Sequence, residues 1–311
     1  MNIVIRSIIF LCVLAAPLLG EGPHLVLYFD VNKTLIATDM ASNKSIDDVI
    51  NEELAAKYVY CWDESLLSPM SYREYIDNVV VPDGKSRAMR KAYLYNFLEY
   101  LRESEHPLFF EAKKKFENVK TCLIQSPSVI FPSFFRLIDY LNGEGISYTI
   151  ILRSYGHEIY DVQDEINYYY AGDLVTQSGQ FREGRLIIGE DKRILSDSLE
   201  IYKYLCRSGH LAIQDDWNYW STHGLKKEMG KPFYVDLEDE EVFSIFFDDN
   251  IMDSEVMNIV APINPKTGES LSVQQMRELG RVMKVDTFEA ILDSDYFVDF
   301  VQKFYGCLQK A

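Results

Sequence analysis

Leu-Val-Leu-Tyr-Phe-Asp-Val-Asn-Lys-Thr, residues 25 to 34, is the stretch that decides the fold. Its first five residues are apolar or aromatic, too few in succession for a helix and rich in β-forming side chains, so they predict a buried central strand. That strand ends at Asp30 and is followed by Asn32, Lys33 and Thr34. Open α/β sheets bind ligands at this end of their strands, so the stretch predicts a site as well as a fold.

The composition of the chain is that of a globular protein with an acidic surface. The 311 residues are 48% hydrophobic and 14% aromatic, which is enough to bury a full core in one large or two modest domains. The formal net charge is -17, and Lys113 to Lys115 form the one compact basic cluster. This balance repels phosphodiester backbones and anionic membrane surfaces, so we expect no nucleic-acid partner.

The first twenty residues differ from the rest of the chain. Arg6 precedes an apolar run from Ser7 to Leu19, which together with Gly20 is typical of a secretory signal peptide over residues 1–20. The run is short for a bilayer span, and no second run of spanning length follows. We expect a secreted or lumenal protein of the secretory pathway without a membrane span after signal removal; an uncleaved anchor is the alternative.

Cysteine usage leaves the redox state open. Cys61, Cys122, Cys206 and Cys307 remain after the signal, an even number that allows three pairings. Their wide spacing, without Cys-x-x-Cys or paired histidines, disfavours a zinc site. The oligomeric state is equally open.

Residues 39–125 predict a mainly helical segment. Ser45-Ile46-Asp47-Asp48 is typical of a helix start, a second helix begins after Pro69, and a third runs from Ser86 to Leu101 with apolar residues at three-to-four spacing. No strong strand pattern interrupts them. The segment is either an insertion into the surrounding fold or an independent helical domain.

Strand and helix patterns alternate from Val129 onward. We expect Ser133 to cap a helix over 134–141, and residues 147–152 to form an apolar strand that ends at Arg153-Ser154. A helix begins at Gly156-His157. Further patterns predict a hairpin over 180–188, a helix over 199–205, a short strand over 211–213, a strand over 281–285 and a helix over 296–304. The loop after residue 213, Gln214-Asp215-Asp216-Trp217, is either a substrate wall or a surface turn.

The strand Val242 to Phe247 carries the second strong signal. It ends in Asp248 and Asp249, and two adjacent carboxylates are costly to hold together unless a cation neutralises them. Mg²⁺ prefers oxygen ligands of this kind. The pair therefore predicts a magnesium site at the end of this strand.

These residues resemble, in order, the motifs of the haloacid dehalogenase (HAD) superfamily. The first motif there is a hydrophobic strand followed by Asp-x-Asp-x-Thr, which corresponds to Asp30 to Thr34. The second is a strand closed by Ser or Thr, as at Ser154, and the fourth corresponds to Asp248 and Asp249.

The third motif of the superfamily is a lysine that neutralises the charge around the nucleophile. Lys226, Lys227 and Lys231 compete for this position. Gly230-Lys231-Pro232 matches its form best, because a Lys-Pro pair after a Gly recurs there.

The resemblance implies an α/β fold with a Rossmann-like, mainly parallel sheet between helices. Residues 21–38 and 126–311 would form this HAD-like core. Residues 39–125 fall where the family inserts a helical cap, which closes over the site, excludes water and selects the substrate.

The resemblance also implies a Mg²⁺-dependent phosphoric monoester hydrolase acting on a small phosphorylated substrate. Asp30 would attack phosphorus and become an aspartyl phosphate, and Mg²⁺ would bridge its carboxylate, the main-chain carbonyl of Asn32 and Asp248 or Asp249. The implied catalytic residues are Asp30, Asn32, Ser154 and Lys231; the implied phosphate-binding residues are Thr34, Ser154 and Lys231.

One residue departs from the motif. Asn32 stands where the phosphatases carry a second Asp, which protonates the leaving oxygen and later activates water. An amide can do neither, and loss of such a group costs on the order of 10² to 10⁴ in rate. Two functions therefore stand: a slow phosphohydrolase or phosphotransferase whose proton comes from elsewhere, with His157 one conceivable donor, and a pseudoenzyme that binds a phosphorylated or anionic ligand. A dehalogenase would have no use for the acidic pair.

Overall fold

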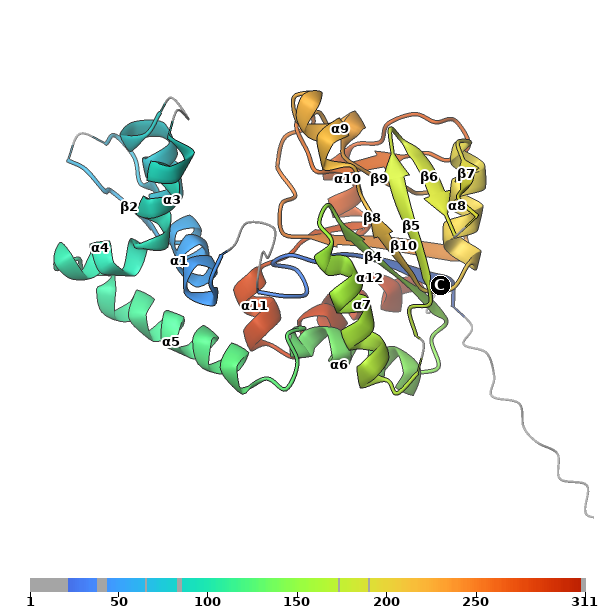
Figure 1. Cartoon of the computed structure of the whole chain (residues 1–311), viewed down its shortest axis with the longest axis horizontal. Coiled ribbons are helices and arrows are strands. Elements are labelled where there is room, and N and C mark those ends of the chain that lie inside the picture. Colours follow the sequence, from blue (N-terminus) through green and yellow to red (C-terminus); the bar gives the residue numbers. More distant parts are fainter. Residues whose placement is uncertain are drawn as a thin grey trace, which may run out of the picture.

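The computed structural model describes residues 22–37, 44–64, 66–82, 86–172, 174–189 and 191–308, so the predicted signal peptide lies outside it. An eight-stranded sheet with helices on both faces forms its centre (Figure 1). In spatial order the strands are β12 (Val282–Lys284), β10 (Val242–Asp248), β1 (His24–Asp30), β4 (Tyr148–Ser154), β8 (Leu211–Gln214), β5 (Gln177–Arg182), β6 (Arg185–Ile188) and β7 (Arg193–Leu195). The strands from β12 to β5 are parallel, and β6 and β7 continue antiparallel. The predicted α/β class with a mainly parallel sheet is confirmed.

Strand β1 lies inside the sheet and is buried on both faces, as its uninterrupted apolar run requires. Leu25, Leu27 and Phe29 point into one core cluster, while Val26 and Tyr28 point into the other. Helices α6 (Pro132–Gly143), α7 (Glu158–Tyr169) and α12 (Tyr296–Leu308) cover the first face, and α8 (Ser198–Arg207), α9 (Trp217–Thr222) and α10 (Val273–Glu278) cover the second.

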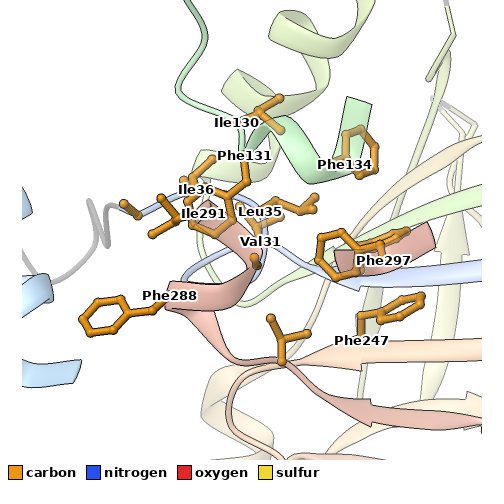
Figure 2. Close-up of a cluster of buried hydrophobic side chains, with 14 of the residues drawn as sticks. Val31, Leu35, Ile36, Ile130, Phe131, Phe134, Phe247, Phe288, Ile291 and Phe297 are labelled. Carbon is orange, nitrogen blue, oxygen red and sulfur yellow. The ribbon is translucent and has the colours of Figure 1, made fainter. Parts of the chain in front are cut away.

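The loop after β1 is anchored in the apolar core. Val31, Leu35 and Ile36 are buried among Phe131 and residues of α11 (Thr287–Leu292), as Figure 2 shows. The Phe131 backbone N–H donates to the Leu35 carbonyl at 2.8 Å, which ties the loop to the chain entering α6. The polar residues between these anchors are therefore held on a rigid support.

The helical segment 46–125 gathers in a lobe beside the sheet (Figure 1). It contains α1 (Ile46–Lys57), α2 (Tyr72–Tyr75), a π-helix (Ile76–Val80), α3 (Arg87–Tyr95), α4 (Phe97–Glu103), α5 (Phe109–Gln125) and the two-stranded pair β2 (Val59–Tyr60) and β3 (Met70–Ser71). The helix start predicted at Ser45 is confirmed by a capping box, in which Ser45 and Asp48 each accept from the other's backbone. The predicted third helix is broken at Asn96 into α3 and α4. The division into a core and a cap stays a prediction.

One predicted helix cap is wrong. Ser133 lies inside α6, which begins at Pro132, and Phe131 is the N-cap without a side-chain cap bond. Proline suits the first helical position because its missing N–H has no partner there in any case. The Ser133 hydroxyl donates instead to the Ala290 carbonyl at 2.6 Å, joining α6 to α11.

A second, smaller sheet was not predicted. β9 (Lys231–Tyr234) pairs in parallel with β11 (Val260–Ile263), and a 3₁₀ turn (Lys227–Met229) leads into β9. Among the residues that the structure describes, no helix combines the length and apolar composition needed to cross a bilayer. Three of the cysteines, Cys61, Cys122 and Cys206, are free thiols.

Candidate active site

Three neighbouring parallel strands end at the same edge of the sheet and bring polar side chains together. β1 ends at Asp30, and its neighbours β4 and β10 end at Ser154 and Asp248. The parallel register places Asp30 opposite Arg153, so the strand ends are level. The carboxyl ends of the strands thus form the edge at which the sequence predicted a site.

Lys231 reaches this edge from the small sheet. Its fully buried ammonium group contacts Asp30 Oδ1 and lies 2.8 Å from Asp248 Oδ2. Burial by itself lowers the pKa of Lys231, but Asp248 and Asp30 outweigh it and raise that pKa. The lysine therefore stays charged between the two carboxylates.

Three carboxylates lie close together beside Lys231. Ligand oxygens of Asp30, Asp248 and Asp249 lie within 4.8 Å of one another. Burial raises the pKa of Asp249 to about 7, with Lys33 opposing the shift and Asp248 adding to it. Burial also raises the pKa of Asp30, against the attraction of Lys231. The site holds more acidic groups than its lysine neutralises.

The acidic cluster fits a hard divalent cation. Asp249 Oδ1 and Asn32 Oδ1 are both buried oxygens without a hydrogen-bond partner among the described residues. Buried oxygens are normally hydrogen-bonded, so unpartnered ones next to a carboxylate cluster suit a metal ion. Asp30, Asp248 and Asp249 are the side chains that could hold Mg²⁺ here.

Thr34 lies below the cluster and supports it. Its side chain is fully buried, and its hydroxyl oxygen accepts a hydrogen bond from the Asp249 backbone N–H at 3.1 Å. Asp248 Oδ1 accepts a similar bond from the Asn250 N–H at 2.8 Å. These bonds fix the loop after β10; phosphate binding by Thr34 stays a prediction.

Glu158 is the residue of this site that the sequence analysis missed. It lies at the start of α7, is buried, and its Oε1 accepts hydrogen bonds from Asn32 Nδ2 at 2.7 Å and from the Ser154 hydroxyl. His157, considered from the sequence as a proton donor, is exposed and stacks on Tyr160. The carboxyl group that lies beside Asn32 is therefore that of Glu158, the residue after His157.

A weak signal for Glu158 was present in the sequence. It follows Ser154 by four residues, at a helix start that comes directly after a strand. An acidic residue in the first turn is ordinarily explained by the helix dipole, so the pattern did not single it out. Its contact with Asn32 joins residues 126 positions apart, which no local pattern reveals.

The competition among three lysines is resolved by position. Lys227 donates to Glu255 and to the Leu271 carbonyl, both at 3.1 Å, and Lys226 is exposed. Lys231 alone of the three contacts Asp30. The structure thus brings together the motif residues that the sequence grouped.

The loop after β8 serves the fold. Asp215 is buried in an ion pair with Arg153, and Asp216 caps α9 by accepting from the Tyr219 N–H at 3.0 Å. Trp220 is buried, whereas Trp217 is half exposed. Of the two interpretations of this loop, the anchored turn agrees with these contacts.

Lys33 links the site to the helical segment. It has a left-handed backbone (φ 62°), and its ammonium group lies 2.9 Å from Glu53 and 3.4 Å from Glu52, both on α1. A cavity of about 510 Å³ lies next to this contact, lined by Arg73 of the helical segment and by Asp249 beyond β10. Space for part of a ligand is therefore available beside the acidic cluster.

Comparison with known proteins adds little to this geometry. No family model and no curated protein matches the chain. Among solved structures, it is similar to a haloacid dehalogenase-like family hydrolase from Xanthomonas campestris, at 10% identity over 94% of this chain and 100% of that chain, with a TM-score of 0.29. A TM-score this low does not establish a common fold.

Proposed function

We propose that this protein is a Mg²⁺-dependent phosphohydrolase or phosphotransferase that works through an aspartyl phosphate at Asp30. The observation that carries this proposal is the grouping of three carboxylates around one buried lysine, Lys231, at the carboxyl edge of a parallel sheet. Excess buried acid of this kind suits a site that binds a divalent cation and, through it, a phosphoryl group.

Each residue would have a distinct task. Asp30 attacks phosphorus and accepts the phosphoryl group, and Ser154 and Lys231 hold the oxygens of that group. Asp30, Asp248, Asp249 and the main-chain carbonyl of Asn32 would hold Mg²⁺, which when bound neutralises charge on the phosphoryl oxygens. The expected ligand is a small phosphorylated molecule, and the expected location is the secretory pathway.

The second candidate function is a binding protein without turnover. It is favoured by Asn32, whose amide cannot transfer a proton. The metal-binding groups do not depend on that proton, so a phosphorylated or anionic ligand would still bind.

Hydrolysis of a panel of phosphate esters separates the two functions. The mature chain, its Asp30→Asn variant and its Asn32→Asp variant are assayed with Mg²⁺ and with EDTA. Mg²⁺-dependent release of phosphate by the wild type, abolished in Asp30→Asn, supports the enzyme. An inactive wild type that gains activity in Asn32→Asp supports the binding protein instead.

A further inference from the structure

We propose that Glu158 is a catalytic residue that performs the two proton transfers Asn32 cannot perform; this inference rests on the proposed function. The Asn32 amide nitrogen lies 2.7 Å from Glu158 Oε1. A carboxyl group therefore lies one hydrogen bond away from motif position 32. The carboxyl group thus lies beside the position from which the second acid of the motif would act on the leaving oxygen.

The Glu158 carboxyl group is held in one orientation. Its Oε1 accepts from both Asn32 and Ser154, so a proton on this carboxyl resides on Oε2. Oε2 lies over Gly156, where a Cβ atom would be 1.8 Å away. Position 156 must lack a side chain for the carboxyl group to stay where it is.

The hydrogen-bond partners of the Glu158 carboxyl group differ from those of the other carboxyl groups at the site. Glu158 is only 5% exposed, and the side chains that donate to it, Asn32 and Ser154, are both neutral. Asp30 and Asp248, in contrast, are both held by Lys231. Glu158 is thus the carboxyl group of the site that is hydrogen-bonded to Asn32 and Ser154 and not to Lys231.

The proposed reaction balances in two steps. First, an Asp30 oxygen bonds to phosphorus, the bond from phosphorus to the ester oxygen breaks, and the Glu158 proton passes to that oxygen, releasing an alcohol. Second, a water oxygen bonds to phosphorus as Glu158 takes a water proton, and the bond from phosphorus to Asp30 breaks, releasing phosphate. Both carboxyl groups return to their starting states.

The Glu158→Gln variant tests this role, because the amide oxygen still accepts from Asn32 and Ser154 while the proton is lost. It is assayed with 4-nitrophenyl phosphate, whose leaving group departs without a proton, and with a simple alkyl phosphate. We expect the alkyl ester to slow by about 10²- to 10⁴-fold. With the nitrophenyl ester we expect a burst of nitrophenolate, and the phosphorylated protein accumulates and is detected by mass spectrometry after acid quench.

Two further variants separate chemistry from positioning. Asn32→Asp added to Glu158→Gln restores turnover of the alkyl ester if the two positions serve one role. Glu165→Gln, the same change farther along α7, is the matched control and leaves both rates unchanged. If Glu158→Gln does not fold, Gly156→Ala displaces the same carboxyl group, and the same loss and burst are expected.

The outcomes distinguish the two levels of the proposal. An active wild type whose Glu158→Gln variant slows both esters equally, without a burst and without rescue, reduces Glu158 to a positioning residue and overturns this inference alone. Unchanged rates in Glu158→Gln overturn it as well. A wild type inactive on every ester overturns the proposed function and this inference together.

Discussion

Two buried cations lie side by side in this protein and have opposite surroundings. Arg153 pairs with a single carboxylate, Asp215, through two nitrogens, donates a third bond to the Pro232 carbonyl at 2.8 Å, and lies 4.8 Å from the centre of the Phe181 ring. Lys231, the residue before Pro232, contacts two carboxylates, Asp30 and Asp248, and a third, Asp249, lies beside them.

The difference teaches how to tell a structural ion pair from a functional one. Around Arg153 the charges cancel and the donors are satisfied, so nothing further is needed. Around Lys231 one positive charge faces excess acid, and buried acceptors are left unpartnered. Burial of charge alone is common to both; an imbalance of charge marks the candidate active site.

The largest expected effect comes from a substitution in the carboxylate cluster at Lys231. Asp30→Asn removes the proposed nucleophile and should lower kcat by at least about 10⁴-fold. It also removes one of the crowded acids, so the metal-free variant should be at least as stable as the wild type. Phosphate release and urea unfolding measure the two effects, and a loss of stability would contradict the proposed charge imbalance.

On the structural side, Asp215→Asn leaves Arg153 buried without its counter-charge. We expect the free energy of unfolding to fall by about 3–5 kcal/mol, because a buried charge that loses its partner is strongly destabilising. Urea denaturation measures the loss. Replacing both partners together, Asp215→Leu with Arg153→Met, should recover most of it, and no recovery would mean that the pair contributes more than charge balance.

Acidity gives a third test that sharpens the comparison. The Asp249 pKa of about 7 lies above its unfolded value, so the folded metal-free protein binds an extra proton between about pH 4 and pH 7. Its stability should therefore fall as pH rises through that window. Mg²⁺ should remove this loss, which Tm measured from pH 5 to pH 8 with EDTA or Mg²⁺ will show. Asp249→Asn is the matched variant. If its Tm depends on pH as steeply as that of the wild type, a group other than Asp249 causes the effect.

The smallest expected effect is that of an exposed pair. Glu183 and Arg185 approach to 3.5 Å with both side chains largely exposed. Glu183→Gln should change the free energy of unfolding by less than about 0.5 kcal/mol, because solvent screens such pairs. Urea denaturation of Glu183→Gln and Asp215→Asn in parallel compares the exposed ion pair with the buried one. A loss above about 1 kcal/mol in Glu183→Gln would mean that burial does not decide how much an ion pair contributes to stability.

Local sequence patterns predicted the parts of the fold that depend on local physics. The runs that became β1, β4 and β10 are apolar and short, and each ends in the polar residue that the site uses. The strands' parallel pairing then follows from the helical crossovers between them. These positions could be predicted because burial of both strand faces leaves a continuous apolar run.

The rest depended on contacts between distant segments. The sequence favoured Lys231 over Lys226 and Lys227 by the form of Gly230-Lys231-Pro232, but its contact with Asp30 depends on the place that β9 gains by pairing with β11. Glu158 was missed because its environment is set by Asn32, in the distant loop after β1. The sequence places Arg153 at the end of a predicted strand, but nothing in it indicates that this side chain is fully buried.

The hydrogen bond from Asn32 to Glu158 also has a consequence for recognising such proteins by search. A sequence pattern over residues 30 to 34 finds Asn32 at the position of the second acid. A template written in distances reports a carboxyl group 2.7 Å from the same amide. A search that scores position 32 alone would record only the missing acid, whereas a search of the space around that position would also find the carboxyl group of Glu158.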